Sequence, residues 1–197
     1  MACLAVLLMS AVFFASLLFL PQFMTKALGF SALKAGAGLA PMMVMFAAAS
    51  FTAGPLYGRL GPKLIITAGA LCIGVGIFLL SLVDASDGYG ALVPGMLILG
   101  AGIGLFYSAI TTLAITTLDP SRSSLAGGIV YMFQIAGGAV GLGLNTAIVT
   151  SHAEATINGL ADGIGQAFRL DAAFAVAALV IVVFIRRRPQ PVPAEAS

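Results

Sequence analysis

The residues of this sequence that could do chemistry are a few polar side chains set within long apolar stretches. One group recurs at steps of three or four residues, the spacing that aligns side chains on one face of a helix. Its members are Tyr131, Gln134, Gly138, Gly141 and Asn145. A second group has similar spacing, and its members are Gly100, Gly104, Tyr107 and Thr111. Each group therefore predicts a helix with its polar and small residues on one face.

Two interpretations of these faces remain open. Polar side chains within a membrane cost free energy unless they face protein or a water-filled cavity. They either line a cavity for a small substrate or form hydrogen bonds across helix interfaces. The cavity candidates are Tyr107, Thr111, Tyr131, Gln134 and Asn145. Small residues let membrane helices approach closely, and the glycines expected to do so are Gly100, Gly104, Gly138 and Gly141.

Titratable side chains are scarce in the apolar stretches. Asp84 and Asp171 are predicted near the outer ends of spans, and His152 lies just outside one. Because a proton carrier needs an ionisable group within the membrane, we predict no convincing proton carrier in this chain. The sequence also has no Gly-Xaa-Ser-Xaa-Gly segment and no metal-ligand spacing. We therefore predict no enzymatic activity, no metal, no cofactor and no nucleic-acid partner.

The elements that must position these residues are transmembrane helices. Hydrophobic residues make up 60% of the 197-residue chain and charged residues only 8%, too few to cover the surface of a soluble fold. Uncharged runs long enough to cross about 30 Å of hydrocarbon separate the charges. We predict an all-α membrane protein with one bundle over 1–186. Its six helices are expected near 3–24, 35–55, 64–84, 91–115, 124–150 and 167–186.

The predicted helices divide into two units of three. An odd number of spans per unit inverts the second unit relative to the first, and inverted three-helix repeats are common in secondary transporters. The connection before the last helix, 151–166, has helix-like spacing of apolar residues among glycines. This pattern fits either a short helix on the outer membrane surface or a flexible loop.

The distribution of cations predicts the orientation in the membrane. One predicted side carries Arg59, Lys63, Arg122, Arg186, Arg187 and Arg188, and the other carries Lys26, Lys34 and Arg169. Because cytoplasmic loops carry an excess of Lys and Arg, we predict a multi-pass protein whose carboxy terminus is cytoplasmic. The tail, 187–197, contains three prolines and is predicted to be disordered.

The connection between the second and third helices has a distinctive pattern of glycines and cations. Its members are Gly54, Gly58, Arg59, Gly61 and Lys63. We expect glycines where the backbone bends sharply or approaches another helix. The cations are expected to contact anionic headgroups or the negative carboxyl ends of neighbouring helices. An ordinary loop that only sets the topology is the alternative.

This segment resembles the loop motif of the major facilitator superfamily, between the second and third helices of each six-helix half. Three other stretches strengthen the resemblance: Leu20–Gln22, Leu28–Gly36 and Gln134–Gly141. Nearly the whole chain is similar to the carboxy-terminal half of a fourteen-helix drug:proton antiporter. The resemblance implies secondary active efflux of small hydrophobic drugs across the cell inner membrane. It also implies that a carboxylate in an amino-terminal half, absent from this sequence, carries the proton.

The sequence departs from the family pattern at Gly58, where the family's loop motif carries an acidic residue. For Arg59 the resemblance therefore implies only a cation at the cytoplasmic contact between two halves. We expect a fragment whose partners are the lipid bilayer and either the missing amino-terminal half or a second copy of itself. The alternative is a truncated or stand-alone six-helix membrane protein without transport activity of its own.

Overall fold

The computed structural model describes residues 2–83, 87–117, 123–152 and 157–184, and the regular secondary structure of these residues is entirely helical. The helices are α1 (Ala2–Lys26), α2 (Ala32–Gly38), α3 (Ala40–Leu60), α4 (Pro62–Leu80), α5 (Tyr89–Thr117), α6 (Ser123–His152) and α7 (Ile157–Phe184). Six segments are long and apolar enough to cross a membrane, with α2 and α3 together forming one of them. The predicted all-helical fold with six spans is therefore confirmed.

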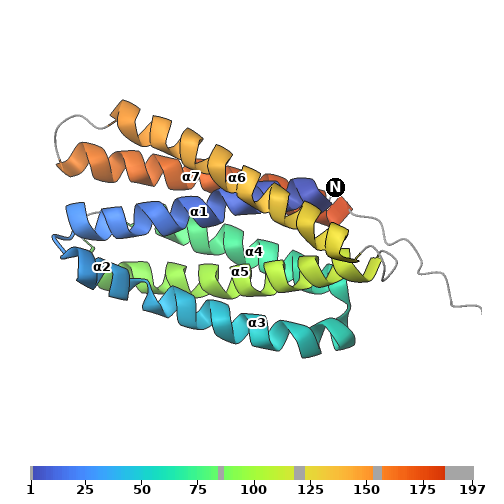
Figure 1. Ribbon diagram of the computed structural model, residues 1–197. Coiled ribbons are helices and arrows are strands. Elements are labelled where there is room, and N and C mark those ends of the chain that lie inside the picture. The colour runs from blue at the N-terminus through green and yellow to red at the C-terminus, as the bar shows by residue number, and fades with distance from the viewer. Residues whose placement is uncertain (1, 84–86, 118–122, 153–156, 185–197) are drawn as a thin grey trace, which may run out of the picture.

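The long helices lie side by side, and the chain reverses direction from each one to the next (Figure 1). We call the end of the bundle where α3 meets α4 the Lys63 end, and the opposite end, where α1 stops, the Lys26 end. The central helix is α1, which packs against α6 and α7 and also contacts α4 and α5. The helix α5 lies between α3 and α4. The apolar core runs along α1, whose fully buried residues include Val6, Met9 and Leu20.

The last helix is longer than the sequence predicts. It was expected from about residue 167, whereas α7 begins at Ile157 and its membrane-spanning part begins at Gly163. Ile164 and Phe168 lie one turn apart and are buried, at 1% and 2% exposure. The segment predicted as a surface helix or loop therefore largely extends the last helix, because these apolar side chains pack inside the bundle. The predicted tail lies outside the described residues.

The second span is interrupted, which the sequence pattern did not indicate. A short helix, α2, ends at Gly38, and α3 begins at Ala40. Pro41 stands in the first turn of α3, where its missing N–H cannot continue the hydrogen bonding of the preceding helix. Tyr89 of α5 donates a 2.9 Å hydrogen bond to the carbonyl of Gly38. The carbonyl at the break therefore serves as the hydrogen-bond acceptor for a side chain of a neighbouring helix.

Candidate functional site

Tyr107 joins α5 to α1 through a polar and an aromatic contact. Its hydroxyl lies 2.7 Å from that of Ser10, which is fully buried. Its ring centroid lies 5.9 Å from that of Phe13, within the range of favourable aromatic pairs. Thr111, one turn further along α5, is also half-buried. Tyr107 therefore lies beside α1, and both cavity candidates on α5 keep part of their surface accessible.

Three aromatic side chains form a continuous row from α5 across α1 to α6. Phe13 contacts Tyr107 on one side and Phe14 on the other, where the ring centroids are 5.4 Å apart. Phe14 in turn lies against Gly138 of α6, because a Cβ at Gly138 would come within 2.7 Å of its ring. All three aromatic residues are half-buried. We call Tyr107, Phe13 and Phe14 the aromatic row.

Neighbouring helices cover only part of the polar stripe of α6, which consists of Tyr131, Gln134, Gly138, Gly141 and Asn145. Gly138, Gly141 and Asn145 are buried against other helices, whereas Gln134 is half-buried and Tyr131 is 62% exposed. The stripe residues share a face as predicted by their spacing, but neighbouring helices cover only its second half. The structure thus keeps Gln134 and Tyr131 accessible as cavity candidates. It does not bring Asn145 to the same surface.

The four glycines chosen for close packing all lie at helix contacts. A Cβ at Gly100 or Gly104 of α5 would overlap backbone carbonyls of α3, those of Met42 and Phe46. On α6, a Cβ at Gly141 would overlap Cα and Cβ of Ala11 in α1. At Gly138, an added Cβ would overlap the ring of Phe14 and not the backbone of the neighbouring helix. Glycine is therefore required sterically at these crossings.

Asn145 is paired with a buried acid, Asp171, that the sequence analysis placed near the end of a span. Both residues are 0% exposed, and Nδ2 of Asn145 donates to Oδ1 of Asp171 over 2.8 Å. Asp171 lies eight residues, or about 12 Å, inside the span that begins at Gly163. The prediction that no acidic side chain lies well inside a span is therefore wrong. It failed because the start of α7 was placed too late.

A periodic signal for this acid was present in the sequence. Asp171 shares a face of α7 with buried residues spaced three or four apart, namely Ile164, Phe168, Ala175, Ala178 and Val182. An ionisable residue in register with an apolar face points into the bundle and not toward the membrane surface. Starting the last helix near residue 167 placed Asp171 close to its end and concealed this pattern.

The loop motif is mostly helical. α3 continues through Gly54, Gly58 and Arg59 to Leu60, and the connection to α4 is Gly61 alone. Gly61 has φ of 79°, which L side chains rarely adopt, so a glycine is needed there. An added Cβ at Gly54 or Gly58 would meet nothing within 4 Å. The expectation that these two glycines serve a bend or a close approach is therefore not met within this bundle.

At the Lys63 end of the bundle, the side chain of Lys63 connects α4 to the last turn of α7. Its Nζ donates a 2.8 Å hydrogen bond to the carbonyl of Val183, one residue before the end of the helix. The last carbonyls of a helix have no intrahelical partner and carry partial negative charge. Lys63 thus contacts the carboxyl end of a neighbouring helix, one of its two expected partners. Arg59 is exposed on α3, and its predicted role stays a prediction.

We expect Lys63→Met to lower the free energy of unfolding by about 1 kcal/mol, because it leaves the Val183 carbonyl without its cationic donor. Thermal unfolding of the purified protein in detergent measures this loss. Arg59→Met is the matched control, since it removes an exposed cation from the same connection. Equal losses in both variants would show that general charge, and not the contact with α7, stabilises this end.

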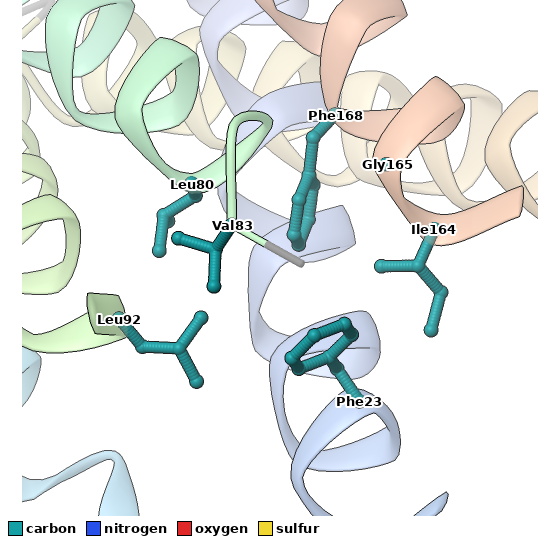
Figure 2. A pocket seen from close by; sticks show the side chains of 7 residues that line it. All are labelled: Phe23, Leu80, Val83, Leu92, Ile164, Gly165 and Phe168. Carbon is teal, nitrogen blue, oxygen red and sulfur yellow. The ribbon is translucent and has the colours of Figure 1, made fainter. Parts of the chain in front are cut away.

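A small apolar pocket lies at the Lys26 end, between α1, α4, α5 and α7. Phe23 and Phe168 face each other across it, with Ile164 beside them and Leu80, Val83 and Leu92 opposite (Figure 2). The space among these side chains amounts to about 190 Å³ and is partly open to the surroundings. Drug-sized ligands occupy about 300–1,000 Å³ and need a few polar groups for orientation. This pocket is a packing gap and not a ligand site.

Among the described residues, six membrane-spanning segments cross at glycines and bury the pair of Asn145 and Asp171, an architecture typical of membrane transporters. Residues 2–197 match the family described as the Major Facilitator Superfamily, and the chain belongs to this family of transporters. It is therefore not an enzyme. The membership of the major facilitator superfamily that the sequence motifs predicted is confirmed.

Several curated proteins are similar to this chain. The multidrug resistance protein Stp of Mycobacterium tuberculosis is 28% identical over 157 residues, which cover 78% of this chain and 29% of Stp. The drug efflux pump JefA of the same species is 30% identical over 77% of this chain and 30% of JefA. The multidrug transporter MdtP of Bacillus subtilis is 26% identical over 73% of the chain and 27% of MdtP. The chain thus spans less than a third of the length of these relatives.

The fold is also similar to that of a solved transporter. A crystal structure of a mutant of the nucleoside transporter NupG superposes with a TM-score of 0.77 at 15% identity. The superposition covers 92% of this chain and 46% of NupG. At this identity the likeness shows the fold alone, which matches roughly half of the NupG chain.

Proposed function

We propose that this chain is one six-helix bundle of a secondary active transporter that exports hydrophobic drugs from the cell. The observation that carries the proposal is the homology to the drug efflux proteins Stp, JefA and MdtP over most of the chain. The aromatic row supports it, because half-buried rings in edge-on and tilted contact within a membrane offer an aromatic surface to hydrophobic compounds. Thr111 and Gln134 would supply the few polar groups that orient a ligand.

The bundle works, in this proposal, against a second bundle, either an amino-terminal half or another copy of the chain. The least covered spans are those that contain α3 and α6. Both carry exposed glycines with open space above them, including Gly58 on α3 and Gly128 on α6. Small residues on an uncovered face permit the close approach of further membrane helices. These faces are our candidates for contact with the second bundle.

The coupling ion and the orientation are further parts of the proposal. The six cations that the sequence assigns to the predicted side of Lys63 and the tail, against three on the other side, support a cytoplasmic location for that side. We propose that export is coupled to proton entry across the inner membrane, with the coupling carboxylate in an amino-terminal half. Arg59 would then lie at the cytoplasmic contact between the bundles.

The proposed cavity is tested most directly at Gln134. We expect Gln134→Ala, introduced at the chromosomal locus, to slow the efflux of at least one fluorescent cationic dye by about three- to tenfold. The physical reason is the loss of one hydrogen-bonding group from the cavity wall, at a position whose side chain is half-buried and has space to be truncated. Dye accumulation and the membrane abundance of the protein are measured in the same cells.

Gln166→Ala is the control, because Gln166 is an exposed glutamine on α7, away from the aromatic row. It is expected to leave dye efflux unchanged. Dye accumulation that stays the same when the whole locus is deleted would contradict the efflux proposal and favour a membrane protein without transport activity. Equal falls in abundance and efflux for Gln134→Ala would instead assign Gln134 to helix packing.

A further inference from the structure

The buried pair of Asn145 and Asp171 is one hydrogen-bond donor short. Among the described residues, Oδ1 of Asn145 and Oδ2 of Asp171 are buried side-chain oxygens without a hydrogen-bond partner. Both belong to groups already joined by the bond from Nδ2 of Asn145 to Oδ1 of Asp171. Buried polar atoms are nearly always hydrogen-bonded, and each one left unpaired costs about 1–3 kcal/mol. Two orphaned acceptors on one pair therefore require an explanation.

The orientation of the Asn145 amide is fixed by its surroundings. Nδ2 lies 3.0 Å from the carbonyl oxygen of Gly141 and 2.8 Å from Oδ1 of Asp171. A backbone carbonyl can only accept, so the atom facing Gly141 must be the nitrogen. Both amide hydrogens are then used. Oδ1 of Asn145 is left needing a donor, and rotating the amide does not supply one.

The neighbouring helices offer no charge to balance an ionised Asp171. α7 packs against α1, α4 and α6. Their spans contain no acidic, cationic or histidine side chain between Ala2 and Thr25, between Leu64 and Leu80, or between Ser123 and Ser151. The titratable or charged groups on these helices are Cys3 and Lys26 on α1, Lys63 and Cys72 on α4, and Tyr131 and His152 on α6.

Among the side chains that the structure describes, none of these groups contacts the carboxyl of Asp171. Lys26, Lys63 and His152 stand at helix ends, and Cys3 lies near the start of α1. Cys72 faces α5, because its Cβ lies 2.9 Å from where a Cβ on Gly102 would stand. Tyr131 is exposed and lies fourteen residues, or about 21 Å, before Asn145 on α6. On α7 itself, Arg169 is exposed while Asp171 is fully buried. An ionised carboxylate would therefore be buried without a counter-charge, which is costly.

We propose that Asp171 is a proton-binding site, in which Oδ2 carries the proton and donates it in a hydrogen bond to Oδ1 of Asn145. The proton comes from solvent and is returned to solvent when the carboxyl ionises, so no other group changes its charge. One proton satisfies both orphaned oxygens at once. The acid and the amide are then joined by two hydrogen bonds, which lock α6 to α7 inside the membrane. This site is independent of the proposed transport activity.

The proposal predicts that stability falls as the pH rises. The folded protein keeps the proton, whereas an aspartate in an unfolded chain loses it above about pH 4. Because the folded state then binds one proton more, raising the pH favours unfolding, by up to about tenfold in the equilibrium constant per pH unit. Asp171→Asn replaces the proposed O–H by an N–H in the same place. It should fold normally and lose this pH dependence.

Thermal unfolding of the wild type and Asp171→Asn in detergent, from pH 5 to pH 8, tests the site. Groups that titrate elsewhere are common to both proteins and cancel in the difference between them. We expect the wild-type midpoint to fall with pH relative to that of Asp171→Asn. A wild-type midpoint that rises relative to the variant, or a difference that does not change with pH, would overturn the proposal.

Infrared spectroscopy of the wild type gives a second test that does not depend on a folded variant. With isotope-labelled aspartate, a protonated carboxyl shows a C=O stretching band that ionised carboxylates lack. We expect this band to persist at neutral pH and to remain in the control Asp87→Asn, whose aspartate is exposed outside the helices. A wild-type spectrum at neutral pH with carboxylate bands alone would show that Asp171 is ionised and the proposal wrong.

Discussion

Replacing Gly141 by alanine is expected to separate α6 from α1 and to reduce the amount of folded protein in the membrane severely. The added Cβ would overlap Cα and Cβ of Ala11, which are rigid parts of the neighbouring helix. Because backbone cannot move aside as a flexible side chain can, one helix must shift as a body. Overpacking of this kind costs about 1–3 kcal/mol or more.

Gly143→Ala is the matched control for this prediction. Gly143 lies on the same helix, is exposed, and has nothing within 4 Å of an added Cβ. Alanine favours a helix over glycine by about 1 kcal/mol, so Gly143→Ala should be neutral or slightly stabilising. Thermal unfolding in detergent and membrane abundance measure both variants. If Gly141→Ala resembled Gly143→Ala, the close crossing of α1 and α6 would be refuted.

Asn145→Ala should destabilise the bundle by about 1–3 kcal/mol, because it leaves Asp171 buried without any hydrogen-bond partner. A charged or neutral carboxyl is affected alike, so this result does not depend on the protonation of Asp171. We expect lower membrane abundance together with a lower unfolding temperature. Thr146→Ala, which truncates the exposed neighbour of Asn145, is expected to change neither quantity.

The double variant Asn145→Leu with Asp171→Leu tests whether the buried pair as a whole contributes to the stability of the bundle. Replacing both partners of a buried polar pair by apolar side chains is often neutral, whereas removing one partner is costly. We therefore expect the double variant to recover much of the stability lost in Asn145→Ala. Unchanged stability of Asn145→Ala with an altered range of exported dyes would instead return Asn145 to the cavity wall, where the sequence analysis placed it.

The periodic spacing in the sequence predicted shared helix faces but not what covers them. Tyr131 and Asn145 belong to one stripe of α6, yet one is largely exposed and the other fully buried. Helical spacing determines only the direction in which a side chain points from its own axis. Whether another helix lies there depends on the crossing of α6 with α1 and α7. Three-dimensional packing therefore assigned Asn145 to the interior and left Gln134 and Tyr131 as cavity candidates.

In the loop motif, too, the sequence pattern predicted some features and only the packing of the helices decided the others. The positions of Gly54, Gly58 and Gly61 were read together as one turn, but only Gly61 has a backbone conformation that requires glycine. A helix can extend through glycine when its ends are held by neighbouring helices, so local composition did not locate the turn. Lys63 was predicted to have an anionic partner, and the packing of α4 against α7 supplies the carbonyl of Val183.

The sequence by itself determined the solvent and the class of fold. The scarcity of charges and their confinement between long apolar runs require membrane helices, because a charged group within hydrocarbon costs several kcal/mol. Only the tertiary structure showed that Asp171 and Asn145, 26 residues apart, meet inside the bundle. Their meeting depends on the register between α6 and α7, which is set by the packing of many side chains at once. No single stretch of sequence contains that register, so the pairing of the acid with Asn145 became visible only when the helices were placed together.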